Sequence, residues 1–248
     1  MSQPRIVPLS KTSHASLTFS PLEDYSFTSA MSSIPLLAFE VPEAAQCFAV
    51  VFPAAGSAIP HALLGLGGKN IFVDAQGRWT ASYLPLYAAN RPFSLIAARS
   101  LERPDTPEVV LAVEEDAPHF HQENGLPLYG EDGAPTPLLQ RIAGTLGNQH
   151  QRHTEREQAL AELNLSGVLR EQSVTIRSDG RARTVGGLRV ADREKVMALP
   201  ADTLAAWARN GLLEMLFAHW RSMRHLRTLL DDPSCPEPTP AAVGKKKD

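Results

Sequence analysis

Two histidines separated by a single residue form the most metal-like pattern in the sequence. On a strand, His119 and His121 would point to the same face, so both imidazoles can reach one ion. Glu123 or a more distant carboxylate would then complete a set of two histidines and one carboxylate, as in non-haem iron sites. His150 and His153 form a second pair, at the i, i+3 spacing of a helix. Both pairs lie in polar, turn-rich sequence, so the alternative is that they are exposed histidines without a metal.

Other catalytic signatures are incomplete or missing. The glycine-rich run from Gly65 to Asn70 is too short for a phosphate loop and has no Ser or Thr to bind magnesium. It also precedes an expected strand, whereas a phosphate site needs the N-terminus of a following helix. No G-x-S-x-G turn is present for a serine nucleophile, and Cys47 lies in an apolar run that disfavours a thiolate. The catalytic residues are therefore unknown.

Arg78 and Trp79 are the most interesting non-catalytic pair. An exposed indole beside a guanidinium can form a platform for a sugar ring or a peptide. Alternation along a strand favours the other arrangement, in which Trp79 points into the core and Arg78 points outward. His219, on an expected C-terminal helix, is interpreted as a structural histidine with satisfied hydrogen bonds.

Composition limits the class of protein. With 248 residues, the chain suits one large domain or two small ones. Its formal charge of −3 gives no general attraction to nucleic acid or anionic lipid. The two cysteines, Cys47 and Cys235, lie at opposite ends of the chain, and nothing else in the sequence indicates an oxidising compartment. We therefore expect no disulfide between them.

Targeting signals are not visible. The first residues lack the basic segment and following apolar stretch of a signal peptide. No apolar run approaches the roughly 20 residues needed to span a bilayer, so no membrane insertion is expected. The sequence predicts a cytoplasmic location, with export by a leaderless route left open.

The elements that must position these residues change in type along the chain. The first half is predicted to be mainly antiparallel β, with a hairpin whose turn uses the positive φ available to Gly77. Residues 1–33 read as an irregular lead-in. Strands are expected at residues 36–41, 47–52, 70–73, 78–83, 93–98 and 109–113.

Helices dominate the second half. Thr136 can cap a helix with Pro137 at its first position, and a polar helix or helix break continues to Leu163. Strands at 174–176 and 188–190 form a second hairpin, and Asp192 and Asp202 are expected to cap short helices. A helix over 212–230 packs on the core with Trp220 as its largest buried anchor. The prediction is one α+β domain over residues 34–230, β-rich to about residue 130, with a disordered tail over 231–248.

An ordered series of short motifs runs along about residues 5–230 and is most distinctive from Asn70 to Trp79. The other segments of the series are Val7-Pro8-Leu9 with His14, Ile34-Pro35-Leu36, Val50-Val51-Phe52, Tyr83-Leu84-Pro85, Arg91-Pro92-Phe93, Pro127-Leu128-Tyr129, Gly186-Gly187-Leu188 and Ala218-His219-Trp220. In this order and spacing the series resembles the SapC family, bacterial proteins of about this length.

Two positions depart from the family's pattern. The family usually has paired basic residues and an aromatic before its Pro-Phe, where this chain has Ala89-Asn90-Arg91, and an acid pair beginning with Asp where this chain has Glu114-Glu115. We include Arg91 with Arg78 and Trp79 among the candidate ligand-binding residues. The resemblance implies a link to crystalline surface layers and carries over no reaction.

Three hypotheses follow from the sequence. The first is a non-catalytic binding or accessory protein that recognises a peptide or glycan partner at the bacterial cell surface, without a cofactor. The alternative is a metal-dependent enzyme that uses a divalent metal at His119 and His121. A third hypothesis is self-assembly as a surface-layer component, and the oligomeric state is left open.

Overall fold

The fold combines antiparallel sheets with helices. A computed structural model describes residues 4–66, 68–98, 108–178 and 181–230. A three-stranded sheet has the order β1-β7-β6, a five-stranded sheet has the order β3-β5-β4-β10-β9, and a short ladder joins β2 to β8. The strands are β1 (Ile6–Pro8), β2 (Thr18–Phe19), β3 (Ser33–Pro35), β4 (Val50–Pro53), β5 (His61–Leu63), β6 (Phe93–Ala98), β7 (Glu108–Glu114), β8 (Leu126–Pro127), β9 (Leu169–Ser178) and β10 (Arg181–Ala191).

Helices follow mainly in the second half of the chain, so the α+β class predicted from the sequence is confirmed. The α-helices are α1 (Lys11–His14), α2 (Val41–Ala44), α3 (Leu86–Ala89), α4 (Pro137–Leu165), α5 (Arg193–Met197), α6 (Ala201–Arg209), α7 (Leu212–Ser222) and α8 (Leu226–Leu230). Single turns of 3₁₀ helix are η1 (Ser26–Thr28), η2 (Ala38–Glu40), η3 (Pro118–Phe120) and η4 (Met223–His225). No helix among the described residues is long and apolar enough to cross a membrane.

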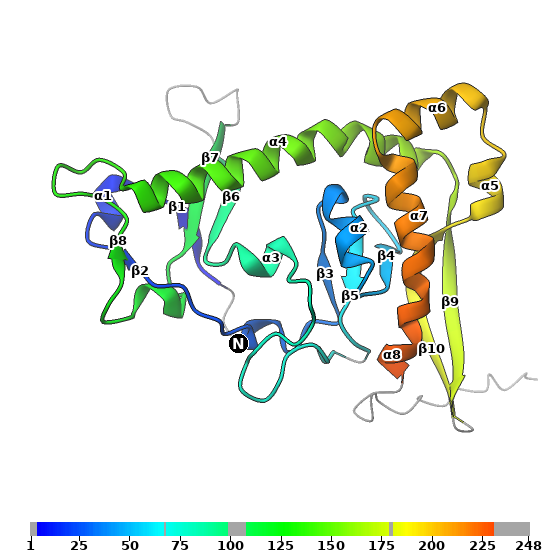
Figure 1. Ribbon diagram of the computed structural model, residues 1–248, viewed down its shortest axis with the longest axis horizontal. Helices are drawn as coiled ribbons and strands as arrows, with labels where there is room; N and C mark the ends of the chain where they lie inside the picture. The colour runs from blue at the N-terminus through cyan, green and yellow to red at the C-terminus, as the bar shows by residue number, and fades with distance from the viewer. Residues whose placement is uncertain (1–3, 67, 99–107, 179–180, 231–248) are drawn as a thin grey trace, which may run out of the picture.

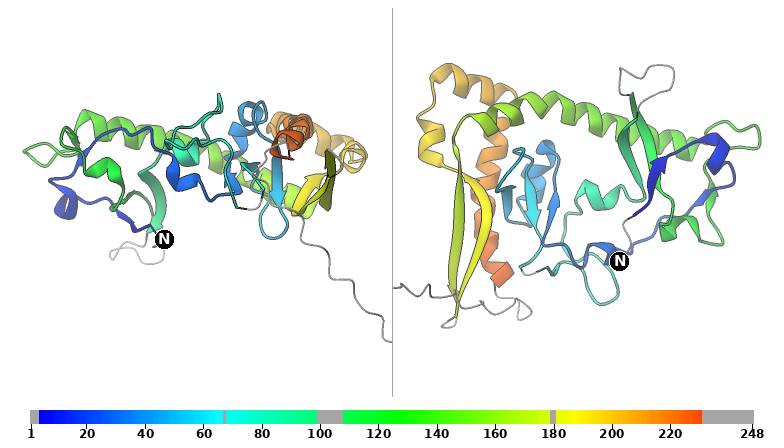
Figure 2. Two further views of the ribbon diagram at one scale, coloured as in Figure 1. Left: turned by 90° about the horizontal axis from the view of Figure 1, so that it is seen from below. Right: turned by 180° about the vertical axis from the view of Figure 1, so that it is seen from behind.

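Helix α4 joins the two ends of the molecule. The three-stranded sheet lies at one end and the five-stranded sheet with α5 to α8 at the other, and α4 runs along both (Figures 1 and 2). Thr136 caps the helix by accepting a hydrogen bond from the Leu139 amide, as predicted. Twenty-nine residues give α4 a length of about 43 Å, enough to pack on a separate core at each end.

Each end has its own hydrophobic core. The smaller core packs Leu139 and Leu146 of α4 against Phe93 and Val113 of the three-stranded sheet. At the other end of α4, Leu160 and Leu163 join the larger core, which is built around the five-stranded sheet, α6 and α7. No residue of α4 between Leu146 and Ala159 is buried. The middle of α4 therefore bridges the two cores.

Buried polar groups hold α7 to the five-stranded sheet. His219 is completely buried, and its Nε2 accepts a hydrogen bond from the Ala191 amide at 3.1 Å. Its Nδ1 must then carry the proton, and it donates to the Val50 carbonyl at 2.7 Å. Ser222 accepts from the Val50 amide at 2.9 Å. Burial lowers the pKa of His219 to about 4, so the structural role predicted for this histidine is confirmed.

Some predicted elements are wrong. Residues 36–41 form no strand, because the Glu40 side chain accepts from the Leu37 amide and turns the chain into η2, which runs on into α2. Asp202 is not a cap, since α6 begins at Ala201 after Pro200. The buried tryptophan of the helical part is Trp207, which is 1 % exposed. Trp220 is half-buried and donates to the Ala191 carbonyl.

The predicted lead-in contains strands and a short helix, whereas the predicted tail lies outside the described residues. In the predicted lead-in, β1 pairs with β7 and β2 pairs with β8, and His14 is buried with its Nε2 2.9 Å from a Glu115 oxygen. Cys47 is free, with its sulfur 3.1 Å from the Ser82 hydroxyl. Cys235 and the predicted tail over 231–248 lie outside the described residues.

Candidate functional site

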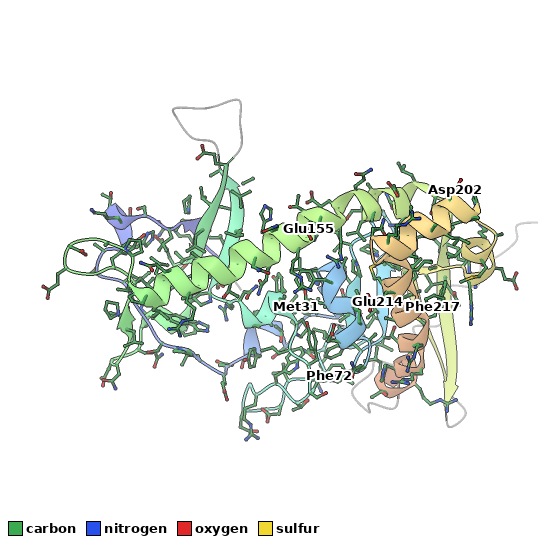
Figure 3. All side chains as sticks on the ribbon, turned by 45° about the horizontal axis from the view of Figure 1, so that its top comes forward. Met31, Phe72, Glu155, Asp202, Glu214 and Phe217 are labelled. Atoms are coloured by element: carbon green, nitrogen blue, oxygen red, sulfur yellow. The ribbon has the colours of Figure 1, made fainter. Side chains whose placement is uncertain are left out.

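A cavity of about 820 Å³ lies between the two cores. Helix α4 covers it, and the short α3 with the residues after it forms the opposite side (Figure 1). Met31, labelled in Figure 3 below the middle of α4, is one of its lining residues. From these elements the lining includes Leu86, Tyr87, Asn90 and Arg91 around α3, Leu146, Gln149, His150 and His153 on α4, Pro92 to Leu95 along β6, and Pro35 to Leu37 after β3.

Arg91 lines this cavity and forms an ion pair with Glu114, so the two charges neutralise each other. Its Nε and one terminal nitrogen donate to the two Glu114 oxygens at 2.8 and 2.7 Å. Each side chain is 17 % exposed, and the Arg91 guanidinium also lies 4.1 Å from the centre of the Phe27 ring. Two parallel charge-assisted bonds fix the guanidinium in place. The cavity therefore contains a rigid, internally compensated pair.

Glu40 reaches the cavity wall from η2 and is 2 % exposed. It accepts hydrogen bonds at 2.8 Å from the Leu37 amide, the Leu86 amide and the Tyr83 hydroxyl. Burial raises the pKa of Glu40, and the three hydrogen bonds offset part of that rise. Its carboxyl group thus fixes the start of α3 against η2, which positions Leu86 and Tyr87 on the cavity.

The polar side chains that α4 contributes to the cavity have fewer hydrogen-bond partners than Arg91 and Glu40. The Gln149 side-chain oxygen accepts a hydrogen bond from the side-chain Nδ2 of Asn90 at 2.7 Å, which ties α4 to the chain after α3. His153 Nε2 lies 3.7 Å from a Glu157 oxygen, too far for a hydrogen bond. Its Nδ1 is buried and has no hydrogen-bond partner among the described residues. Buried polar atoms are nearly always paired in folded proteins, so this nitrogen is an exception among the described residues.

The structure does not place His119 and His121 on a strand. They lie on and just after η3, so they do not share a strand face. His119 is buried and stacks on Phe19 with ring centres 6.0 Å apart, whereas His121 is exposed. Burial, with a smaller contribution from the Arg91 charge, lowers the pKa of His119. Among the described residues no group of three or more His, Cys, Asp or Glu is arranged to hold a metal. Metal binding by the pair stays a prediction.

Arg78 and Trp79 do not line the cavity. The segment from Asn70 to Tyr83 forms one bridge, between Val73 and Trp79, instead of two strands. Gly77 has the predicted positive φ of 79°. Arg78 is exposed and paired with Asp74 at 2.8 Å. The Trp79 indole donates to the Tyr83 carbonyl and packs against the larger core. Ligand binding by this pair stays a prediction.

Sequence reasoning missed most of the cavity. The sequence pointed to Arg91 and to the spacing of His150 and His153, but not to their shared position on one cavity. The other polar lining groups, including Glu40 and Gln149, come from segments far apart in the chain. Only the departure from the family's acid pair drew attention to Glu114, and the sequence contained no signal that it would meet Arg91.

Comparison with known proteins gives one finding. The model of the SapC family matches residues 9–229 of the 248-residue chain. No curated protein and no solved structure matches.

Proposed function

Because the chain belongs to the SapC family, we propose that it is a non-catalytic binding protein whose ligand occupies the central cavity. The volume of about 820 Å³ lies within the roughly 300–1,000 Å³ range of ligand sites. The surface-layer link of the family resemblance supports an accessory role at the bacterial cell surface. A peptide suits the cavity better than a glycan, because apolar and aromatic side chains together form most of its lining.

The make-up of the cavity wall is the observation that carries this proposal. Apolar side chains form most of the wall, and the charges of Arg91 and Glu114 on it already neutralise each other. A ligand with apolar groups is therefore favoured, because covering that wall removes apolar surface from water.

The hydrophobic dye bis-ANS is a suitable probe of the cavity. Ser94→Trp places an indole on a lining residue, whereas Ala97→Trp makes the same change at an exposed residue of the same strand that is absent from the lining. We expect one saturable dye site in the parent chain and in Ala97→Trp. Ser94→Trp should weaken dye binding at least about tenfold.

Thermal unfolding of both variants controls for loss of structure. If folded Ser94→Trp binds the dye as tightly as the parent chain, the cavity is not the binding site and the proposal fails.

A further inference from the structure

The cavity lies against the edge of a strand. Pro92, Phe93, Ser94 and Leu95 are consecutive, and all four line it. Side chains alternate between the two faces of a sheet, so a cavity over one face would contact only every second residue. The lining also includes Ile6 of β1 and Glu114 of β7, which are neighbours of Pro92 across the sheet. The cavity thus covers one face at this end of the sheet, and its contacts with Phe93 and Leu95 extend it to the free edge of β6. In the strand order β1-β7-β6, no described strand lies beyond that edge.

The register shows which backbone groups point into this space. The Glu114 amide donates to the Pro92 carbonyl, so Pro92 and Glu114 form a hydrogen-bonded pair. Hydrogen-bonded and non-hydrogen-bonded pairs alternate along an antiparallel ladder. Ser94, paired with Ala112, therefore bonds to β7, whereas the N–H and C=O groups of Leu95 and Ala97 point away from it. Leu95 is a lining residue, and its outward N–H and C=O groups have no hydrogen-bond partner among the described residues.

This edge also lacks the features that usually prevent strand pairing. Exposed edges are commonly protected by charged residues, proline or very short length. Other edge strands of the two larger sheets have such features: β1 is three residues long and contains Pro8, β3 contains Pro35, and β9 contains Arg170 and Glu171. The β6 sequence, Phe-Ser-Leu-Ile-Ala-Ala, contains neither charge nor proline.

The β3 edge contacts the same cavity but offers less to an incoming strand. Pro35, Leu36 and Leu37 are consecutive lining residues, so this edge also reaches the cavity. Pro35 has no N–H, and the Leu37 amide already donates to Glu40 at 2.8 Å. The β3 side therefore provides mainly apolar contact, and β6 is the strand whose main chain can pair with an incoming strand.

We propose that the cavity binds an extended polypeptide segment of a partner protein, which pairs with the free edge of β6 as a fourth strand of the β1-β7-β6 sheet. Main-chain hydrogen bonds to Leu95 supply affinity, and alternate apolar side chains of the segment enter the cavity. The inference rests on the proposed function, because it names the ligand class of the same cavity.

A random library of ten-residue peptides displayed on phage and selected on the full chain provides the probe. The best peptide is then synthesised with single backbone N-methyl groups at each position in turn. Strand pairing predicts that methylation weakens binding about tenfold at alternate residues and has little effect at the residues between them. This pattern is independent of any change to the protein.

Leu95→Pro removes the outward N–H without removing a bond to β7, and Leu95→Ala is its matched control because it shortens the side chain but keeps the N–H. We expect Leu95→Pro to weaken the selected peptide about tenfold more than Leu95→Ala does. Thermal unfolding checks that both variants are folded.

Three results would overturn the inference. N-methylation that is tolerated equally at every position would show binding through side chains alone. A library that enriches no peptide, while bis-ANS still binds the cavity, would reject a peptide ligand and leave the proposed function intact. A dimer in sedimentation that Leu95→Pro dissociates would identify a second copy of the chain as the occupant. Loss of the proposed function itself would instead appear as bis-ANS binding that Ser94→Trp does not change.

Discussion

Acidification should unfold the protein partly through His219. The imidazole is completely buried, accepts from the Ala191 amide and donates to the Val50 carbonyl. Its pKa is lowered from 6.5 to about 4, because burial disfavours the charged form, with the Val50 hydrogen bond opposing this. Between these two values the unfolded chain binds a proton at this position and the folded chain does not. The free energy of unfolding therefore decreases as the pH falls through this window.

The size of the effect follows from the two pKa values. One pKa unit corresponds to about 1.4 kcal/mol, so a fall from 6.5 to about 4 gives His219 a contribution of about 3 kcal/mol. It is fully present above about pH 7 and lost by about pH 4. His219→Asn removes the titrating group. At pH 7.5 it should destabilise the protein by about 1–3 kcal/mol, because at least one backbone group loses its partner.

Urea unfolding at several pH values from 4 to 8 measures both effects. Ser222→Ala is the matched control, because it also leaves a backbone group of Val50 unpaired but does not titrate. It should destabilise by a similar amount without changing the pH dependence. His219→Asn should instead approach the stability of the parent chain as the pH falls. If the difference between parent and His219→Asn is the same at pH 4.5 and 7.5, the assigned burial and hydrogen bonding of His219 are wrong.

Other substitutions test the elements that shape the cavity. Arg91→Met leaves Glu114 half-buried without its partner, and we expect a loss of about 2–3 kcal/mol in urea unfolding; a loss under 0.5 kcal/mol would contradict the rigid pair. Thr136→Ala removes the cap of α4 and should cost about 1 kcal/mol, whereas no change in the unfolding midpoint would mean that the cap contributes nothing. Elemental analysis of the purified chain should find less than one iron, zinc or manganese per molecule, unchanged by His121→Ala; stoichiometric metal that this variant removes would favour the enzyme hypothesis.

Local signals in the sequence predicted the elements that depend on local chemistry. The cap at Thr136, the positive φ of Gly77 and the cap at Asp192 all occur as expected, because each depends on a few neighbouring residues. The strand over 93–98 was also predicted with the bounds of β6, since its apolar residues lie between a proline and a polar loop.

Elements that depend on distant partners were not predictable in the same way. The segment 36–41 has the composition of a strand, yet Glu40 folds back on Leu37 and accepts from Tyr83 and Leu86, more than 40 residues away. No sequence pattern near Glu40 predicts hydrogen bonds from Tyr83 and Leu86.

The site was hidden for the same reason. The spacing of His119 and His121 suggests a strand, but a 3₁₀ turn buries His119 and leaves His121 exposed. His150 and His153 were noticed for helical spacing, and only the path of α4 between two cores places them over a cavity. A cavity formed between distant elements has no period or motif of its own.

A crystal structure of the chain with bis-ANS bound tests the central claim most directly. The account predicts dye density beneath the middle of α4, in contact with Met31, Leu95 and His153. Dye bound elsewhere, with this cavity empty or closed by its own side chains, would contradict the assignment of the cavity as the binding site.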